Sequence, residues 1–134
     1  MKDCVFCKII AGEKHGYKIY EDSHAIAILD INPVNKGHAL VMLKKHAENL
    51  SELSAEEVKN LFTAAQKVAG SMNRNLGAEG VNYFVNEGKV AGQLVFHVHC
   101  HVLPRYSNDG INFHTPRKKM SEEEMREIAE RLRI

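Results

Sequence analysis

The segment of residues 94–103 reads Leu-Val-Phe-His-Val-His-Cys-His-Val-Leu and places a histidine at every second position from 97 to 101. Successive side chains of a β-strand point to opposite faces of the sheet, so every second residue shares a face. The pattern predicts a long strand over residues 94–103, with His97, His99 and His101 projecting together at roughly 6–7 Å intervals. Cys100 falls on the opposite face and is predicted to be a small core residue rather than a reactive thiol.

Three imidazoles on one face of a strand can bind a metal, act as acid, base or nucleophile near neutral pH, or decorate a solvated surface. A solvated surface is the weakest interpretation, because such strict alternation on an apolar segment is improbable by chance. A three-histidine catalytic zinc site is also disfavoured, since a short strand segment offers two ligands at convenient geometry and the third usually comes from elsewhere. The pattern therefore favours nucleophilic or acid–base chemistry.

Strands and two well-marked helices surround this segment. Ser54 and Glu57 have the spacing of a capping box, and Gly77 is placed to end the helix that follows. The helix face expected to cover the sheet consists of Val58, Leu61, Phe62, Ala65, Val68, Ala69 and Met72. The other predicted elements are a short helix capped by Asp3 and ending at Ile10, strands over residues 17–21, 25–29, 38–43 and 81–85, and a final helix over residues 122–132 capped by Ser121. This order indicates one α+β domain over residues 1–134, a five-stranded, mostly antiparallel sheet with one long helix packed on it.

The composition is that of an ordinary globular domain, with 44% hydrophobic and 26% charged residues. The formal net charge of +1 does not favour nucleic acid as a partner, because nucleic-acid grooves usually need a basic excess. No apolar run approaches the ~20 residues of a membrane-spanning helix, and the N-terminus lacks the pattern of a secretory signal. A cytoplasmic location is expected.

Cys4 and Cys7 have the spacing of a metal-binding or redox pair. A thioredoxin-type role would place the pair after a strand in a βαβ unit, whereas this pair lies on the predicted N-terminal helix. Zinc would need two further ligands. A zinc site, a reduced thiol pair and a redox pair therefore remain open at this point, with zinc favoured.

The segment of residues 92–103 resembles the signature of the histidine triad (HIT) family, in which three histidines alternate with apolar residues. The resemblance extends over residues 3–105 and leaves the tail, residues 106–134, only loosely similar. The matching segments are Cys4-Val5-Phe6-Cys7-Lys8-Ile9-Ile10, Tyr20-Glu21-Asp22, Leu29-Asp30-Ile31-Asn32-Pro33, Gly37-His38, Lys44-Lys45-His46 and Asn86-Glu87-Gly88. The resemblance implies a HIT-like fold.

The resemblance also implies a mechanism with a covalent nucleotidyl-histidine intermediate. His99 matches the nucleophile, and His101 matches the histidine that touches the phosphate and helps to protonate the leaving group. His38 supports the same site, while Asn86 and Gln93 match polar positions that contact the α-phosphate or the bridging atom. Backbone N–H groups of residues 92–95 are expected to hold the non-bridging oxygens. Many relatives carry Ser or Thr at the position of Leu94. Because Leu94 has no hydroxyl donor, the resemblance defines the identity of the leaving group less closely.

The same resemblance implies a nucleoside pocket and a structural zinc site. Asp30 is expected to accept hydrogen bonds from the ribose hydroxyls. The nucleotide-binding set is Val5, Phe6, Ile9, Ile28, Asp30, Ile31, Asn86, Gly92, Gln93, Val95, His99 and His101. The zinc ligands are Cys4, Cys7, His46 and His97, a set used by some bacterial and archaeal relatives, and no organic cofactor is expected.

The expected function is therefore that of a hydrolase or transferase acting on purine nucleoside phosphoramidates or dinucleoside polyphosphates. One alternative is a non-catalytic module that binds purine nucleotides or another protein. Another is a metallohydrolase that uses the three histidines as zinc ligands. The resemblance further implies a homodimer in which the long helix and a sheet edge pair to form a ten-stranded sheet.

Overall fold

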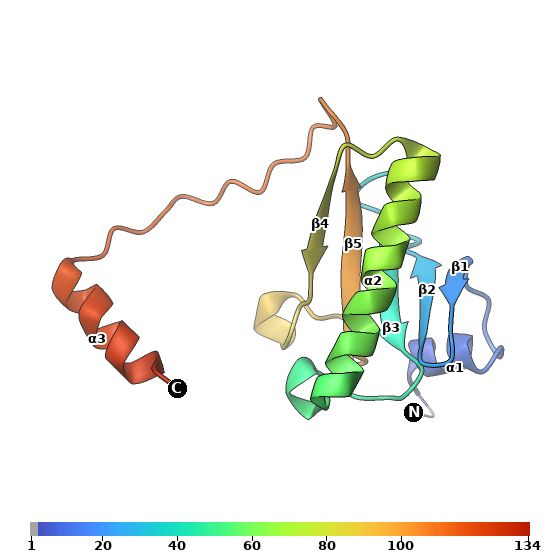
Figure 1. Cartoon of the computed structure of the whole chain (residues 1–134), viewed down its shortest axis with the longest axis horizontal. Coiled ribbons are helices and arrows are strands. Elements are labelled where there is room, and N and C mark those ends of the chain that lie inside the picture. Colours follow the sequence, from blue (N-terminus) through green and yellow to red (C-terminus); the bar gives the residue numbers. More distant parts are fainter. Residues whose placement is uncertain (1–2) are drawn as a thin grey trace.

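The computed structural model describes residues 3–134 and contains a single five-stranded antiparallel sheet. The strands lie in the order β1-β2-β3-β5-β4, and the long helix α2 crosses one face (Figure 1). The strand bounds are β1 (Lys18–Glu21), β2 (Ala25–Leu29), β3 (Ala39–Leu43), β4 (Gly80–Phe84) and β5 (His99–Arg105). The helices are α1 (Val5–Ile10), α2 (Ala55–Leu76) and α3 (Glu122–Leu132), with single-turn 3₁₀ helices at Leu50–Glu52 and Lys89–Ala91. The predicted α+β fold class is confirmed.

Helix α2 begins and ends where its capping residues lie. Ser54 Oγ accepts a hydrogen bond from Glu57 N at 3.1 Å, and Glu57 Oε2 accepts one from Ser54 N at 2.9 Å. Gly77 adopts a positive φ of 68° at the other end, a conformation that costs glycine little. The buried face of the helix differs from the prediction. Phe62 is 38% exposed and Val58 is only partly buried, whereas Ala64 is buried.

The two faces of the sheet carry separate apolar clusters. Alternate residues of β2 and β3, together with Val98, Cys100 and Val102, pack against α2. The intervening residues, among them Ile28 and Met42, pack against Phe6 of α1 on the opposite face. His99 pairs with Met42 and His101 with Leu40 in the β3–β5 register, so both histidines lie on the α1 face.

Strand β5 begins at His99 rather than at Leu94, which corrects the predicted strand. The side chain of Leu94 is 89% exposed, and that of Gln93 is buried. Val98 N donates a hydrogen bond to Ala47 O at 2.8 Å, and Ala47 lies beyond the end of β3. Regular pairing between β3 and β5 therefore starts one residue later, at His99. His97 therefore lies just before the strand. The predicted cap of α1 is also wrong, because Cys4 occupies the N-cap position instead of Asp3.

The chain beyond β5 leaves the sheet as an extended segment and ends in α3 (Figure 1). Ser121 Oγ accepts from Glu124 N at 3.1 Å and caps α3, as predicted. Within residues 3–134, no helix is long and apolar enough to cross a membrane.

Candidate active site

His99 is held in one tautomer by the backbone. Its Nδ1 lies 2.7 Å from the carbonyl oxygen of His97, and a carbonyl can only accept, so Nδ1 carries the hydrogen. The lone pair is therefore on Nε2. Burial lowers the pKa of His99, which keeps the ring neutral at pH 7, and the ring of Phe6 packs edge-on against it at 5.0 Å between centroids. A neutral imidazole with a defined lone pair is suited to nucleophilic attack.

His38 and His101 are linked by a hydrogen bond whose donor and acceptor can be assigned. Val34 N donates to His38 Nδ1 at 3.1 Å, so the hydrogen of His38 is on Nε2. That nitrogen lies 2.9 Å from His101 Nδ1 and donates to it, which leaves the hydrogen of His101 on Nε2. Burial, with smaller contributions from the neighbouring His99 and His38, lowers the pKa of His101 to about 4. His101 is thus a neutral hydrogen-bond donor beside the lone pair of His99, at 5.0 Å between ring centroids.

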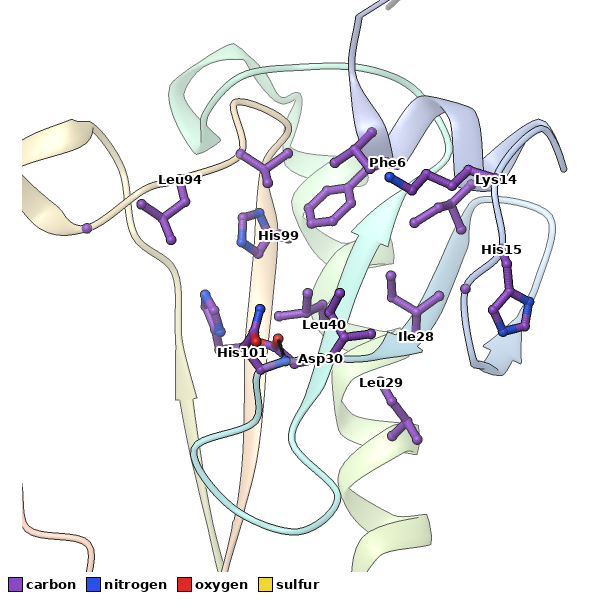
Figure 2. Close-up of a pocket in the computed structure, with 17 residues that line it drawn as sticks. Phe6, Lys14, His15, Ile28, Leu29, Asp30, Leu40, Leu94, His99 and His101 are labelled. Carbon is purple, nitrogen blue, oxygen red and sulfur yellow. Dashed lines mark hydrogen bonds between the residues drawn. The ribbon is translucent and has the colours of Figure 1, made fainter.

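A cavity of about 290 Å³ opens beside these two histidines. Ten of the twelve predicted nucleotide-binding residues line it, namely Val5, Phe6, Ile9, Ile28, Asp30, Ile31, Gly92, Val95, His99 and His101. Figure 2 shows His99 and His101 on one side, Asp30 below, and the apolar side chains of Phe6 and Ile28 between them and Lys14. The cavity thus joins an apolar slot to one carboxylate and to the two imidazoles of β5.

Asn86 and Gln93 lie outside the cavity lining. Gln93 is 3% exposed, and its amide is used within the protein: Oε1 accepts from Gly88 N at 2.9 Å, and Nε2 donates to Glu48 O and Val95 O at 2.8 and 3.1 Å. Gln93 therefore holds together the loop that carries Gly92 and Val95. Its own N–H donates to Gly88 O at 3.1 Å, which commits that group too.

The cavity also includes residues outside the predicted nucleotide-binding set. Lys14, His15 and Gly16 come from the loop between α1 and β1. Leu29 and Leu40 come from β2 and β3, Asn32 from the loop after β2, and Leu94 from the loop before β5. A Cβ on Gly16 would lie 2.8 Å from Ile9 Cγ2, so glycine lets this loop pack closely on α1. The composition of the loop gives no sign of this packing.

The four predicted metal ligands converge at the N-terminus of α1. Their ligand atoms all lie within 4.8 Å of one another. Cys7 Sγ is 3.3 Å from His46 Nδ1 and 3.5 Å from His97 Nδ1, and Cys4 Sγ is 3.6 Å from His97 Nδ1. Zinc bonded tetrahedrally to sulfur at ~2.3 Å and nitrogen at ~2.05 Å would separate such atoms by about 3.5–3.6 Å. The donor set and its spacing therefore fit a tetrahedral Cys2His2 zinc site.

The orientation of His97 supports the same assignment. Its Nε2 lies 2.8 Å from Leu43 O and must donate to it, so the lone pair on Nδ1 points to the two cysteines. Burial lowers the pKa of His97 to about 4. His97 therefore joins the cysteine cluster, and the three histidines do not converge on one metal.

The fold and this site define a class of small α+β domains that present histidines from one strand to an apolar, carboxylate-bearing pocket. Residues 11–108 match the HIT domain. An uncharacterized HIT-like protein of Methanocaldococcus jannaschii is 49% identical over 80% of this chain and 82% of its own. The chain belongs to the HIT family, whose members are nucleotide-binding hydrolases and transferases.

Solved structures agree with this assignment. A crystal structure from Streptococcus mutans superposes with a TM-score of 0.93 at 36% identity, covering 98% of this chain and 84% of that one. A zinc-bound histidine triad protein from Mycobacterium smegmatis gives a TM-score of 0.80 at 39% identity, covering 93% and 89%. The described Cys/His cluster and this zinc-bound relative together indicate a metal-binding site.

Proposed function

We propose that this protein is a nucleotidyl hydrolase or transferase that cleaves a purine nucleoside phosphoramidate or a dinucleoside polyphosphate through a covalent intermediate on His99. The observation that carries the proposal is the hydrogen bond from His99 Nδ1 to the carbonyl of His97, which leaves a lone pair on Nε2 beside the pocket. An exposed, freely rotating histidine would have no such preference.

The geometry supports a two-step displacement. In the first step His99 Nε2 attacks the α-phosphorus, the N–P bond forms, and the bond from phosphorus to the leaving group breaks. A phosphate departs as the anion, and an amine departs with a proton taken from solvent. His101 Nε2–H is the donor placed to hydrogen-bond the departing atom, and His38 keeps it in that tautomer. In the second step water attacks phosphorus and loses a proton to solvent while the N–P bond breaks, which releases the nucleoside monophosphate and restores neutral His99.

The pocket supports a ribonucleotide as substrate. Asp30 Oδ1 accepts from Asn32 N at 2.9 Å, which positions the carboxylate, and the second oxygen lies 3.7 Å from His38 Nε2. A carboxylate at the edge of an apolar slot is suited to accept hydrogen bonds from a ribose diol. The slot between Phe6, Ile9 and Ile28 offers flat apolar walls to a purine.

The remaining predicted contacts are also part of the proposal. Leu94 and Val95 are the candidates to donate backbone N–H groups to the phosphate, because Gln93 N already donates to Gly88. Gln93 acts as a positioning residue for this loop. Asn86, whose amide packs behind Gly92, is a further candidate to contact the substrate once it is bound.

We assign zinc to Cys4, Cys7, His46 and His97 as a structural ion. When bound, it would lock the N-terminus of α1 to the segment before β5 without an open coordination position. Because the site needs thiolates rather than a disulfide, we place the protein in the cytoplasm, where thiols stay reduced. We also propose that the protein is a homodimer.

The proposal is tested by mixing the protein with a panel of adenosine and guanosine phosphoramidates and dinucleoside polyphosphates and measuring release of the monophosphate. Rapid quenching followed by peptide mass spectrometry should find a nucleotidyl group on His99. His99→Ala should abolish turnover yet retain nucleotide binding. A non-catalytic module is the answer if wild type and His99→Ala bind alike and neither turns over any substrate.

A further inference from the structure

The cavity of the candidate active site has two chemically different ends. His99 and His101 lie on β5, whereas Lys14 belongs to the loop that precedes β1. Strands β1 and β5 are three positions apart in the sheet, which corresponds to ~14 Å. Figure 2 shows Phe6 and Ile28 between the two histidines and Lys14. A nucleotide whose phosphate lies at His99 and whose base enters the apolar slot therefore directs the far edge of that base towards Lys14.

Lys14 brings positive charge to this end of the cavity. Among the described residues that line the cavity, Lys14 is the one lysine, and none is an arginine. No carboxylate of residues 3–134 lies within 4 Å of its Nζ, whereas Lys18 and Lys44 both pair with Glu21 of β1. Figure 2 shows the Lys14 side chain reaching from its loop towards Phe6. Its ammonium group is thus available to a ligand in the slot.

The backbone of this loop is fixed against α1. Glu13 N and Lys14 N both donate to Lys8 O, at 2.8 and 3.2 Å. A Cβ on Gly16 would lie 2.8 Å from Ile9 Cγ2, so the loop packs closely on the helix that forms one wall of the slot. The position of Lys14 relative to the slot is therefore set before a ligand binds, which lowers the entropy that binding must cost.

An ammonium group at this position discriminates between purines. A lysine side chain has three hydrogen-bond donors and no acceptor. Guanine presents two acceptors, O6 and N7, along one edge, whereas adenine presents the N6 amino donor where guanine has O6. Lys14 can donate to both acceptors of guanine, but it would place a donor against a donor in adenine. The residue therefore favours a 6-oxopurine.

The other polar side chains at this end do not make the same distinction. His15 and Asn32 also line the cavity. A neutral imidazole and a carboxamide each offer a donor and an acceptor, so either group can satisfy adenine as well as guanine. The His15 ring also packs edge-on against Tyr17, at 4.7 Å between centroids. Lys14 is thus the group at this end that can only donate.

Solvent limits how strongly Lys14 can select. Its side chain is exposed, and beside it lies a second hollow of about 420 Å³ that is also lined by Glu13 and Lys18. Water in this hollow keeps part of the ammonium hydrated when a base is bound. A lysine that contacts O6 and N7 of guanine discriminates by about 5–150-fold. For a solvated lysine we expect the lower part of this range, about 10-fold.

From these observations we propose that Lys14 makes the cavity a site for 6-oxopurine nucleotides. Lys14 Nζ donates to O6 and N7 of guanine or hypoxanthine and selects guanosine or inosine nucleotides over adenosine nucleotides. This inference rests on the proposed function, because it takes the phosphate to lie at His99 and the ribose at Asp30. It deepens that function by naming the base.

Calorimetry on the zinc-loaded full chain tests the selection with nucleoside monophosphates, which carry no leaving group. GMP and IMP should bind about 10-fold more tightly than AMP. IMP shares O6 and N7 with GMP but lacks the 2-amino group, so equal binding of GMP and IMP assigns the preference to the edge that faces Lys14. The monophosphate of 2-aminopurine riboside, which has the 2-amino group without O6, should bind like AMP.

Substitutions of Lys14 assign the preference to this side chain. Lys14→Met keeps an apolar stem without the ammonium and should bring GMP and AMP to within about 2-fold of each other. Lys14→Arg retains donors and should preserve the preference. Lys59→Met is the matched control, because it removes the same charge from an exposed position of α2 outside the cavity and should leave the ratio unchanged.

The ratio of the GMP and AMP dissociation constants decides between the outcomes. Equal binding of GMP and AMP by the wild type, or an unchanged ratio in Lys14→Met, would overturn the proposal. Equal weakening of both nucleotides in Lys14→Met would show that Lys14 attracts the phosphate instead of reading the base, and would overturn it as well. Failure of the proposed function is distinguishable, because the wild type would then bind none of the four monophosphates, and this inference would fall with it.

Discussion

The backbone carbonyl of His97 lies 2.7 Å from Nδ1 of His99, so one residue serves two sites. Its side chain faces Cys4 and Cys7, and its carbonyl fixes the tautomer of the proposed nucleophile. The cysteine cluster and the reactive imidazole are thus joined by a single peptide unit. A disturbance of the metal site should reach the reaction without any contact to substrate.

His46→Ala tests this coupling, because His46 belongs to the metal cluster and does not line the cavity. We expect the variant to lose zinc and kcat to fall about 10–100-fold, with a smaller change in KM. Metal content by mass spectrometry and steady-state kinetics measure the two effects. His24→Ala, at an exposed histidine, is the control and should behave as wild type. Full activity in a zinc-free His46→Ala protein would disprove the coupling.

The hydrogen bond from His38 to His101 makes a separate prediction. His38→Phe keeps a ring but removes the donor that fixes His101, so kcat should fall about 10–100-fold while nucleotide affinity changes little. His38→Gln retains an N–H donor and should recover part of the loss. Steady-state kinetics measures kcat, and calorimetry measures nucleotide affinity. If the phenylalanine variant matched wild type in kcat, His101 would not depend on this partner.

Asp30→Asn should reduce discrimination between ribose and 2′-deoxyribose. A carboxylate accepts stronger hydrogen bonds from the hydroxyls than an amide oxygen does. The substitution should therefore lower kcat/KM for a ribonucleotide about 10–30-fold. The 2′-deoxy substrate should lose much less, so the ratio of the two values is the informative quantity. Glu13→Gln removes an exposed carboxylate outside the cavity and serves as control. An unchanged ratio would exclude ribose recognition by Asp30.

The sequence predicts those parts of the fold whose signals are local. The bounds of α2 follow from Ser54 and Gly77, which lie next to the residues they cap. The start of β5 does not follow from neighbouring residues, because residues 93–98 form hydrogen bonds with residues that are distant in the sequence. Gln93 bonds to Glu48 O, and Val98 N bonds to Ala47 O. Alternation of apolar residues cannot reveal such contacts.

The same distinction applies to the candidate site. The motif indicates which histidines matter, but the direction of a side chain depends on packing, as Gln93 shows by turning away from the cavity. Lys14 and His15 reach the cavity because Gly16 lets their loop approach Ile9. No spacing rule connects that loop with residues of β5, so the sequence alone could not include it.

The half-buried, neutral His101 makes stability depend on pH. Its pKa is about 4 in the folded protein, mainly because burial disfavours the charged ring, against an ordinary value of 6.5. Between these two values the unfolded chain binds the proton and the folded chain does not, so protons favour unfolding. The contribution of His101 is therefore fully present above pH 6.5 and is lost as the pH falls towards 4. At pH 5 the loss should be about 1–2 kcal/mol, allowing for partial exposure of the ring.

Urea unfolding at pH 7 and pH 5 measures this contribution. The free energy of unfolding of the wild type should fall between pH 7 and pH 5 by more than that of His101→Gln. The difference between the two losses should be about 1–2 kcal/mol. Protonation of groups that do not interact with His101, including the cysteine cluster, affects both proteins and cancels in the difference. His24→Gln removes an exposed histidine and should lose as much as wild type. An equal loss in wild type and His101→Gln would show that His101 titrates alike in the folded and unfolded chains, and its role as a neutral donor would have to be abandoned.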